Sequence, residues 1–182
     1  MDLKEDLKEA LRERLHIKEI KRISTLCQSD ELKSELYQLV ADADERVGYN
    51  ALWIFTHLPR GHGQWLRNKR DELIDRLLSV THIGQRRLLL TLLENQPLAE
   101  TDVRSDYLDY CLSGINSCEP YATRALCLKQ AYAQCRFYPE LMRELMAEIE
   151  LMDCGEMSPG LRSARKNILK KLQSSVLPQD LH

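Results

Sequence analysis

Apolar residues recur every three or four positions along almost the whole chain, which is the spacing of one face of an α-helix. Leu3, Leu7 and Leu11 begin this pattern, and Leu32 and Leu36 repeat it further along. No segment alternates apolar and polar residues for long enough to indicate a β-strand. The pattern therefore predicts an all-α protein of about ten helices, most of them roughly 11 to 16 residues long.

Prolines mark several of the expected helix boundaries. Pro59 ends the helix expected over residues 46–58, because proline cannot continue a helix. Pro120, Pro139 and Pro159 suit the first positions of three later helices. Turns as short as these place consecutive helices antiparallel to each other. Further helices are expected over residues 65–79, 85–95 and 101–114.

Alternate helices begin with similar strings, which indicates an internal repeat. The strings are RVGYNALW (46–53), HIGQRRLL (82–89), PYATRALC (120–127) and PGLRSARK (159–166). Their small residues are Gly48, Gly84, Ala122 and Gly160, and the steps between them are 36, 38 and 38 residues. Near-constant spacing of this length predicts a repeat of two helices.

One segment carries a family resemblance. DELKSELYQLVADADERVGYNALWIFTHL (30–58) reads as a helix, a turn containing Asp, and a helix that opens with Val and a small residue. In this it resembles HEAT and armadillo-like repeats, and the resemblance covers about residues 30–174. It implies a right-handed α–α superhelix in which the second helix of each pair lines the concave side. The family's Asp, followed by Arg six residues on, would match Asp42 and position 48, where this chain has Gly48.

The length of 182 residues suits one domain, and we expect a single helical-repeat domain over 1–182. Residues 1–28 would form a capping helix pair, since end repeats are normally atypical. A flexible tail is expected over 176–182. The repeat units in between are expected at 30–58, 65–95, 101–136 and 139–174.

Composition narrows the functional classes. Lys and Arg number 26 and Asp and Glu 28, and the resulting net charge of −2 argues against a histone-like binder of polyanions. The chain has no continuous apolar segment typical of a secretory signal or a membrane span, so a cytoplasmic protein without a membrane partner is expected. The six cysteines show no metal-ligand spacing, and no nucleophile signature is present. We therefore expect a protein that is not an enzyme and has no metal or other cofactor.

Charge is separated between first and second helices in the later repeats. Residues 139–153 carry five acidic side chains and one basic one, whereas residues 159–174 carry five basic side chains and no acidic one. Residues 101–115 and 119–136 show the same contrast more weakly. If second helices line the concave side, that side is positively charged.

Arginines recur two places beyond three of the small residues, as Arg86, Arg124 and Arg162, whereas Asn50 holds the first such position. With Arg165 and Lys166 in the last helix they form a candidate partner-binding surface, because guanidinium groups bind carboxylates and phosphates in bidentate fashion. The alternative is that these arginines bridge neighbouring helices through acidic side chains or backbone carbonyls.

A second candidate binding surface is aromatic. Tyr49, Trp53 and His57 follow each other at intervals of four residues, off the main apolar face of their helix. Such a stripe is suited to anchor a partner residue. The alternative is that it packs against the previous helix pair. The loop 59–65, which contains Arg60 and His62, is interpreted as a plain connector rather than an anion site.

Three functions fit these observations. The first is an interaction scaffold that binds an acidic protein or peptide on a basic concave face. The second is nucleic-acid binding, as in the DNA-alkylation-repair glycosylases built from HEAT-like repeats. Such chemistry needs a carboxylate that faces the DNA-binding groove, whereas the acidic side chains in the second helices, such as Glu94 and Glu119, lie near helix ends. The third is a subunit whose ends or apolar patches make an oligomer. The sequence favours the first and does not fix the oligomeric state.

Overall fold

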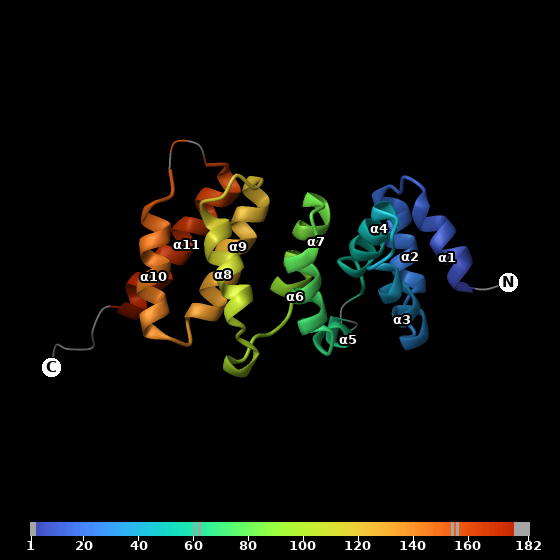
Figure 1. Cartoon of the computed structure of the whole chain (residues 1–182), viewed down its shortest axis with the longest axis horizontal. Helices are drawn as coiled ribbons and strands as arrows, with labels where there is room; N and C mark the ends of the chain where they lie inside the picture. The colour runs from blue at the N-terminus through green and yellow to red at the C-terminus, as the bar shows by residue number, and fades with distance from the viewer. Residues whose placement is uncertain (1–2, 60, 62, 154, 156, 177–182) are drawn as a thin grey trace. The chain divides into compact units, whose positions relative to one another are not determined.

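The computed structural model describes residues 3–59, 61, 63–153, 155 and 157–176, and the regular structure of these residues is entirely helical (Figure 1). The all-α prediction is therefore confirmed for the described part of the chain. The tail was predicted over 176–182, but residue 176 is the last of the helix Pro159–Val176; residues 177–182, and Arg60 and His62 of the connector, lie outside the described residues.

The chain divides into two compact units, Met1–Gln96 and Pro97–His182, here called the N-terminal and C-terminal units. The prediction of a single domain stays a prediction. The helices of the N-terminal unit are α1 (Leu3–Arg12), α2 (Ile17–Leu26), α3 (Asp30–Leu39), α4 (Glu45–Phe55), α5 (Gly63–Arg67), α6 (Arg70–Ser79) and α7 (Ile83–Glu94). Those of the C-terminal unit are the 3-10 turn η1 (Glu100–Asp102), α8 (Ser105–Ile115), α9 (Tyr121–Cys135), α10 (Pro139–Glu150) and α11 (Pro159–Val176).

Helix α4 is the centre of packing in the N-terminal unit. It contacts α1, α2 and α3 and also α7, which is itself paired with α6. Val47 and Ala51 of α4 are fully buried, and Leu88 and Leu92 of α7 are nearly so, whereas Leu58 is only half-buried. The second helices of consecutive pairs thus pack directly on each other, and their apolar faces supply the core.

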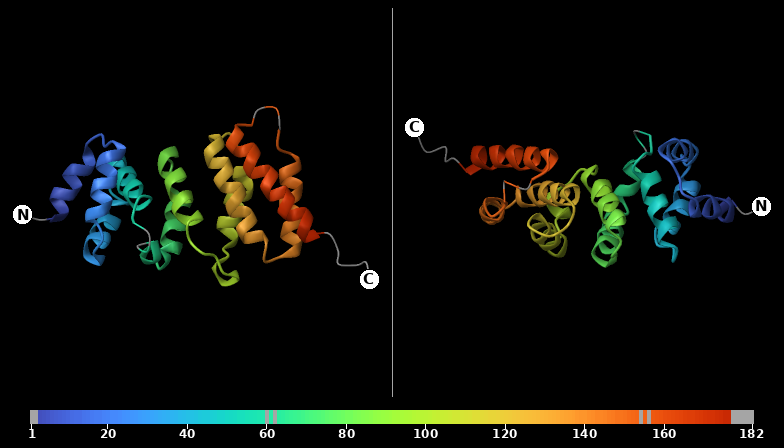
Figure 2. Two further views of the ribbon diagram at one scale, coloured as in Figure 1. Left: turned by 180° about the vertical axis from the view of Figure 1, so that it is seen from behind. Right: turned by 90° about the horizontal axis from the view of Figure 1, so that it is seen from above.

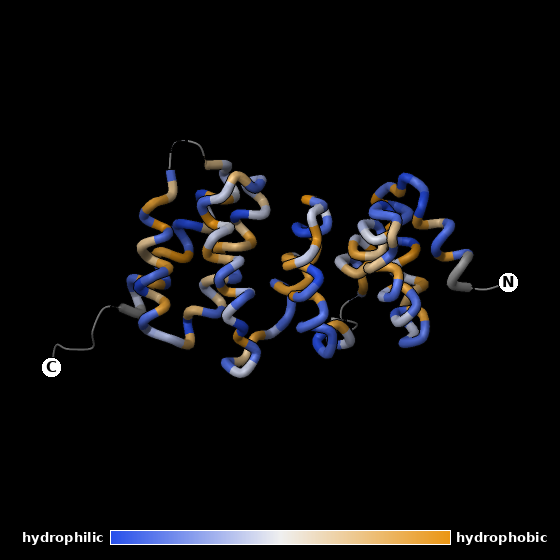
Figure 3. The backbone as a smooth tube through the Cα atoms, in the orientation of Figure 1, coloured by the Kyte–Doolittle hydropathy of each residue, from blue (hydrophilic) through white to orange (hydrophobic). Residues whose placement is uncertain are grey.

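The C-terminal unit repeats this arrangement with two pairs. The first helices α8 and α10 pack together, and so do the second helices α9 and α11, which lie side by side in Figure 2. Leu128 and Ala131 of α9 and Leu161 of α11 are fully buried. Hydrophobic and hydrophilic residues alternate along each helix with the period of the sequence pattern (Figure 3).

Besides α4, which ends at Phe55 rather than at residue 58, two predicted helices differ from those observed. The helix expected over residues 65–79 is divided at Asn68 and Lys69, where Lys69 has φ −108° and ψ 10°. Asparagine favours such a break because its side chain competes for backbone hydrogen bonds. The helix expected from residue 101 begins at Ser105 instead. The Asp102 carboxylate accepts a hydrogen bond from the Ala99 backbone N–H (2.9 Å), which stabilises the preceding 3-10 turn as a separate element.

The glycines of the repeat have different structural roles. A Cβ at Gly48 would lie 2.9 Å from the Val40 carbonyl oxygen, where α4 passes the end of α3. A Cβ at Gly84 would lie 2.8 Å from the Tyr49 ring. Gly160 has open space around it. Of these three glycines, Gly48 and Gly84 are therefore the ones in close approach to a neighbour.

The turn after α3 is held by an ion pair rather than by the Asp–Arg pattern of related repeats. The Asp42 carboxylate lies 2.6 Å from Lys8 Nζ of α1 and accepts a hydrogen bond from the Asp44 backbone N–H (2.9 Å). The bond from Lys8 is the main cause that lowers the pKa of Asp42, and the Asp44 backbone bond adds to it. The acid of the turn thus joins the first helices of two consecutive pairs.

Candidate interaction surfaces

The three repeat arginines all donate to backbone carbonyls. Arg86 Nε bonds to the Val80 oxygen (3.0 Å), Arg124 Nε to the Ile115 oxygen (2.8 Å) and Arg162 Nη2 to the Met157 oxygen (3.3 Å). Val80 is the C-cap of α6 and Ile115 is the last residue of α8. A positive charge is favourable at a helix C-terminus, where carbonyls lack intrahelical partners.

For Arg86 and Arg124 the structure therefore shows the carbonyl-bridging contact that was the alternative, whereas the acceptor of Arg162 lies in the segment just before its own helix. Arg86 and Arg124 are half-buried, and Arg162 is exposed. Arg165 is half-buried and its Nε bonds to the Ile149 oxygen (3.3 Å) in the last turn of α10. Binding of a partner by any of these arginines stays a prediction.

Helix α11 presents an exposed basic stripe. Arg162, Lys166 and Lys170 are all exposed, and their spacing of four residues places them along one side of the helix. We call these three residues the α11 stripe. The neighbouring α10 exposes Glu140, Glu144 and Glu150. The exposed charges of α10 are therefore mostly acidic, with Arg143 as the exception, whereas those of α11 are basic.

At the first arginine position, Asn50 makes a different contact. Its side chain is nearly fully buried, and its Nδ2 donates to the carbonyl oxygens of Leu11 (2.9 Å) and Glu13 (3.1 Å). These two residues belong to the end of α1 and to the connector that leads to α2. Asn50 thus fixes this connector against α4.

The predicted aromatic residues do come together on α4. The ring centroids of Tyr49 and Trp53 are 5.9 Å apart, and those of Trp53 and His57 are 6.3 Å apart. Tyr49 also lies 5.7 Å from the ring of His82, which precedes α7. The His57 ring bonds through Nδ1 to the Trp53 backbone oxygen (3.0 Å), so His57 is engaged at the end of its own helix. Their role as partner contacts stays a prediction.

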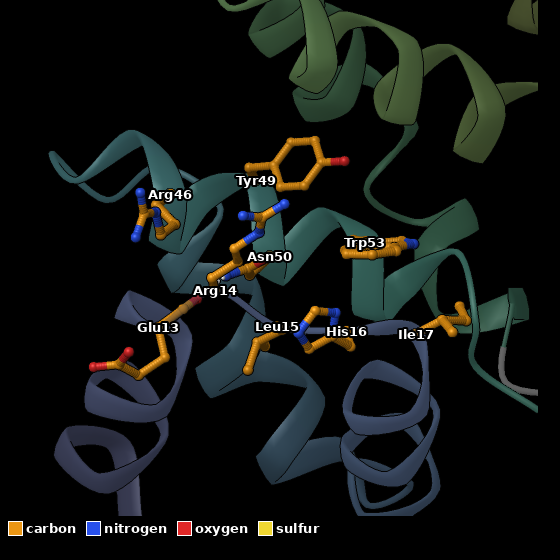
Figure 4. Close-up of a pocket in the computed structure, with 9 residues that line it drawn as sticks. All are labelled: Glu13, Arg14, Leu15, His16, Ile17, Arg46, Tyr49, Asn50 and Trp53. Carbon is orange, nitrogen blue, oxygen red and sulfur yellow. Dashed lines mark hydrogen bonds between the residues drawn. The ribbon is translucent and has the colours of Figure 1, made fainter.

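Tyr49 and Trp53 line a pocket of about 530 Å³ in the N-terminal unit, which we call the connector pocket (Figure 4). A second pocket of about 750 Å³ shares Arg46 and Tyr49 with it. The connector pocket is lined by Glu13, Arg14, Leu15, His16, Ile17, Arg46, Tyr49, Asn50 and Trp53.

Two exposed arginines, Arg14 and Arg46, stand at this pocket, and sequence analysis did not single them out. Among the described residues, neither forms an ion pair, and the Glu13 carboxylate points away from them in Figure 4. Arg46 makes a long contact from Nη1 to the Arg12 carbonyl oxygen (3.5 Å). Asn50 stands where the later repeats have Arg86, Arg124 and Arg162. Arg46 lies one helical turn before Asn50, so a cation is still present near this position.

Comparison with known proteins identifies the family. A family model described as a HEAT repeat domain matches residues 7–172. The chain belongs to the HEAT repeat family. The match includes most of α1 and all of α2, which lie before the segment that carried the resemblance in the sequence. Searches of curated proteins and of solved structures found no match.

Two buried thiols of this HEAT repeat domain, Cys111 and Cys135, are poorly suited to nucleophilic chemistry. Burial raises the pKa of Cys135 to about 12, and the nearby Glu144 charge adds to this effect. Burial is the main cause that raises the pKa of Cys111 well above its usual value, and a side-chain hydrogen bond with Cys127 adds to it. Because the thiolate is the reactive form, these side chains are inert at neutral pH.

Two further observations concern metals and membranes. In the described part of this HEAT repeat domain, no group of three or more His, Cys, Asp and Glu side chains is placed to hold a metal ion. Over the same residues, no helix combines the length and the hydropathy needed to cross a bilayer.

Proposed function

We propose that this HEAT repeat domain is a non-enzymatic scaffold that binds an acidic protein or peptide segment through the α11 stripe. HEAT repeats typically mediate protein interactions, which supports a scaffold. The observation that carries the choice of partner is the stripe itself: three exposed cations on a helix with no acidic residue over 159–174. Complementary charge on a partner would speed association and fix its register.

The spacing of the stripe suits an extended partner. Residues four apart on a helix are separated by roughly 6 Å along its axis. Alternate residues of an extended chain are separated by roughly 6.6 Å and point to the same side. A segment with an acidic residue at every second position would therefore match Arg162, Lys166 and Lys170 one to one.

Charge reversal tests this proposal. The probe is a fluorescein-labelled peptide of alternating Glu and Ser, compared with the same peptide carrying Gln for Glu, and binding is followed by fluorescence anisotropy at low ionic strength. The full chain with Arg162→Glu, Lys166→Glu and Lys170→Glu should bind the Glu peptide at least about tenfold more weakly than wild type.

A matched control is Arg143→Glu, an exposed position on the acidic helix α10, which should change the Kd by less than about twofold. Far-UV circular dichroism checks that helicity is kept in every variant. An unchanged Kd in the triple variant, or equal binding of the Gln peptide, would contradict the proposal.

Nucleic-acid binding is the alternative for the same stripe, because phosphates would also pair with it. The overall charge of −2 disfavours it, since binding to a polyanion gains its affinity from an excess of cations. Anisotropy with a labelled DNA duplex separates the two functions. Tighter binding of the duplex than of the Glu peptide, with a steep dependence on salt, would favour the alternative.

A further inference from the structure

We infer that the connector pocket is a second recognition site, which binds a carboxylate of an acidic partner segment together with an adjacent apolar side chain. The inference rests on the proposed binding of acidic segments and adds a sequence preference to it. The site is wholly within the N-terminal unit, so it is argued and tested independently of the α11 stripe.

The cationic part of the site is formed by Arg14 and Arg46. Both guanidinium groups are exposed, and among the described residues neither has an acidic partner. The lining has two arginines and one acidic residue, Glu13, whose carboxylate points away from both in Figure 4, so the pocket carries local positive charge. A carboxylate is the complementary group, because it accepts two parallel N–H bonds from a guanidinium.

The apolar part of the site is formed by Tyr49, Trp53 and Ile17. The two rings are tilted against each other on α4, and Ile17 at the start of α2 is 43% exposed. Ile17 is exposed and Tyr49 and Trp53 are half-buried, and at protein interfaces aromatic side chains and arginine carry much of the binding free energy.

The pocket is held in place by a buried contact. Arg14 lies in the connector between α1 and α2, and the two hydrogen bonds from Asn50 Nδ2 to Leu11 and Glu13 fix the backbone just before it. Asn50 is 3% exposed, so water does not compete for these two hydrogen bonds. A pocket arranged in advance loses less entropy when it binds. Its volume of about 530 Å³ lies within the range of small-ligand sites and accommodates a few side-chain groups rather than a whole helix.

The partner is therefore a segment that places an apolar residue next to an acidic one. The acidic side chain meets Arg14 and Arg46, and the apolar side chain lies against Trp53 and Ile17. Acidic residues alone would engage only half of the site. This distinguishes the connector pocket from the α11 stripe, which offers charge without an apolar wall.

The first experiment compares two labelled peptides on the full chain, Ser-Asp-Glu-Phe-Glu-Asp-Ser and the same peptide with Ala for Phe. Wild type should bind the Phe peptide more tightly. Arg14→Gln combined with Arg46→Gln should weaken binding of the Phe peptide by about tenfold, whereas the exposed Arg22→Gln on α2 should not. Ile17→Ser, at an exposed position that tolerates a polar side chain, should bring the two peptides to equal affinity.

The second experiment locates the peptide directly. The chain has two tryptophans, so its indole N–H groups give two resonances, assigned with Trp65→Phe. Saturating Phe peptide should shift the Trp53 indole resonance and leave that of Trp65, which stacks on Phe55, unchanged. No shift at Trp53 would overturn the inference.

The remaining outcomes separate this inference from the proposed function. If the α11 triple variant loses all peptide binding while the arginine double variant keeps it, the connector pocket is not a binding site and the proposed function stands. If the double variant loses binding and the triple variant keeps it, the connector pocket stands and the role of α11 fails. If wild type binds neither peptide, both are overturned.

Discussion

Equivalent residues of the repeat reach in two directions. Arg86 and Arg124 reach back within their own helix pair to the carbonyls that end α6 and α8. Asn50, at the same register in α4, reaches to the previous pair instead, where it bonds to Leu11 and Glu13. A short amide suits the closer, buried contact, while the longer guanidinium spans the gap between two helices and carries a charge that the helix end favours.

Gly48 should tolerate a methyl group much less well than Gly160. A Cβ at position 48 would meet the Val40 carbonyl oxygen at 2.9 Å, and a backbone atom cannot move aside easily. We expect Gly48→Ala to lower the free energy of unfolding by about 1–2 kcal/mol, because strain outweighs the gain in helix propensity. Gly160→Ala meets nothing and should raise it by up to about 1 kcal/mol. Urea unfolding followed by circular dichroism measures both, and equal shifts would contradict the prediction.

The pair between Lys8 and Asp42 should make stability depend on pH in acid. Because the pKa of Asp42 is lowered in the folded state, its contribution is present above the unfolded pKa of about 3.9 and is lost as the pH falls through the folded pKa. Lys8→Met removes the main cause of that shift. The difference in urea midpoint between wild type and Lys8→Met should therefore shrink as the pH is lowered below about 4.

The exposed Lys18→Met serves as the control for this measurement. Its urea midpoint should remain close to that of wild type at every pH. A difference between wild type and Lys8→Met that is constant across the acid range would show that the pair does not act through the titration of Asp42.

Helices were predictable from the sequence because each must bury one face. That requirement makes apolar residues recur every three or four positions along the chain. Their ends were less predictable, because they depend on single side chains. The break at Asn68 and Lys69 carries no proline or glycine, and the late start of α8 depends on a bond from the Ala99 N–H to Asp102 that a periodic pattern does not contain.

The contact of Arg124 with the end of α8 should contribute measurably to stability. Arg124→Ala leaves the Ile115 carbonyl without the 2.8 Å bond from Nε and should cost about 1–2 kcal/mol. Arg162→Ala removes a longer bond of 3.3 Å at an exposed position and should cost less than about 0.5 kcal/mol. Both variants lie in the C-terminal unit, so one urea titration compares them directly. A larger loss for Arg162→Ala would contradict this assignment.

At the scale of the whole molecule, each helix pair gains its stability from its neighbours. In the N-terminal unit α4 packs on four other helices, whereas α1 packs on α3 and α4 and buries Leu11. Amide hydrogen exchange of the full chain should therefore find the strongest protection in α4 and the weakest in α1, with α3 between them. Protection of α1 equal to that of α4 would contradict this gradient.

The candidate site was predictable only where its residues share one helix. Tyr49, Trp53 and His57 follow each other at helical spacing, so their contact on α4 could be expected. Arg14 lies in a connector, and its approach to α4 depends on how two helix pairs pack, which no local pattern encodes. The arginine series illustrates the converse: its spacing was visible, but its carbonyl partners were not.

The intrapair bonds of Arg86 and Arg124 bear on how such a chain can change in length. Donor and acceptor come from the same stretch of fewer than forty residues. A gene duplication that copies a complete helix pair therefore also copies the hydrogen bond between its two helices. An insertion or deletion whose boundary falls between the two helices of a pair would separate the guanidinium from its carbonyl. Lengthening the chain by whole helix pairs therefore preserves this hydrogen bond, and adding a single helix between the two breaks it.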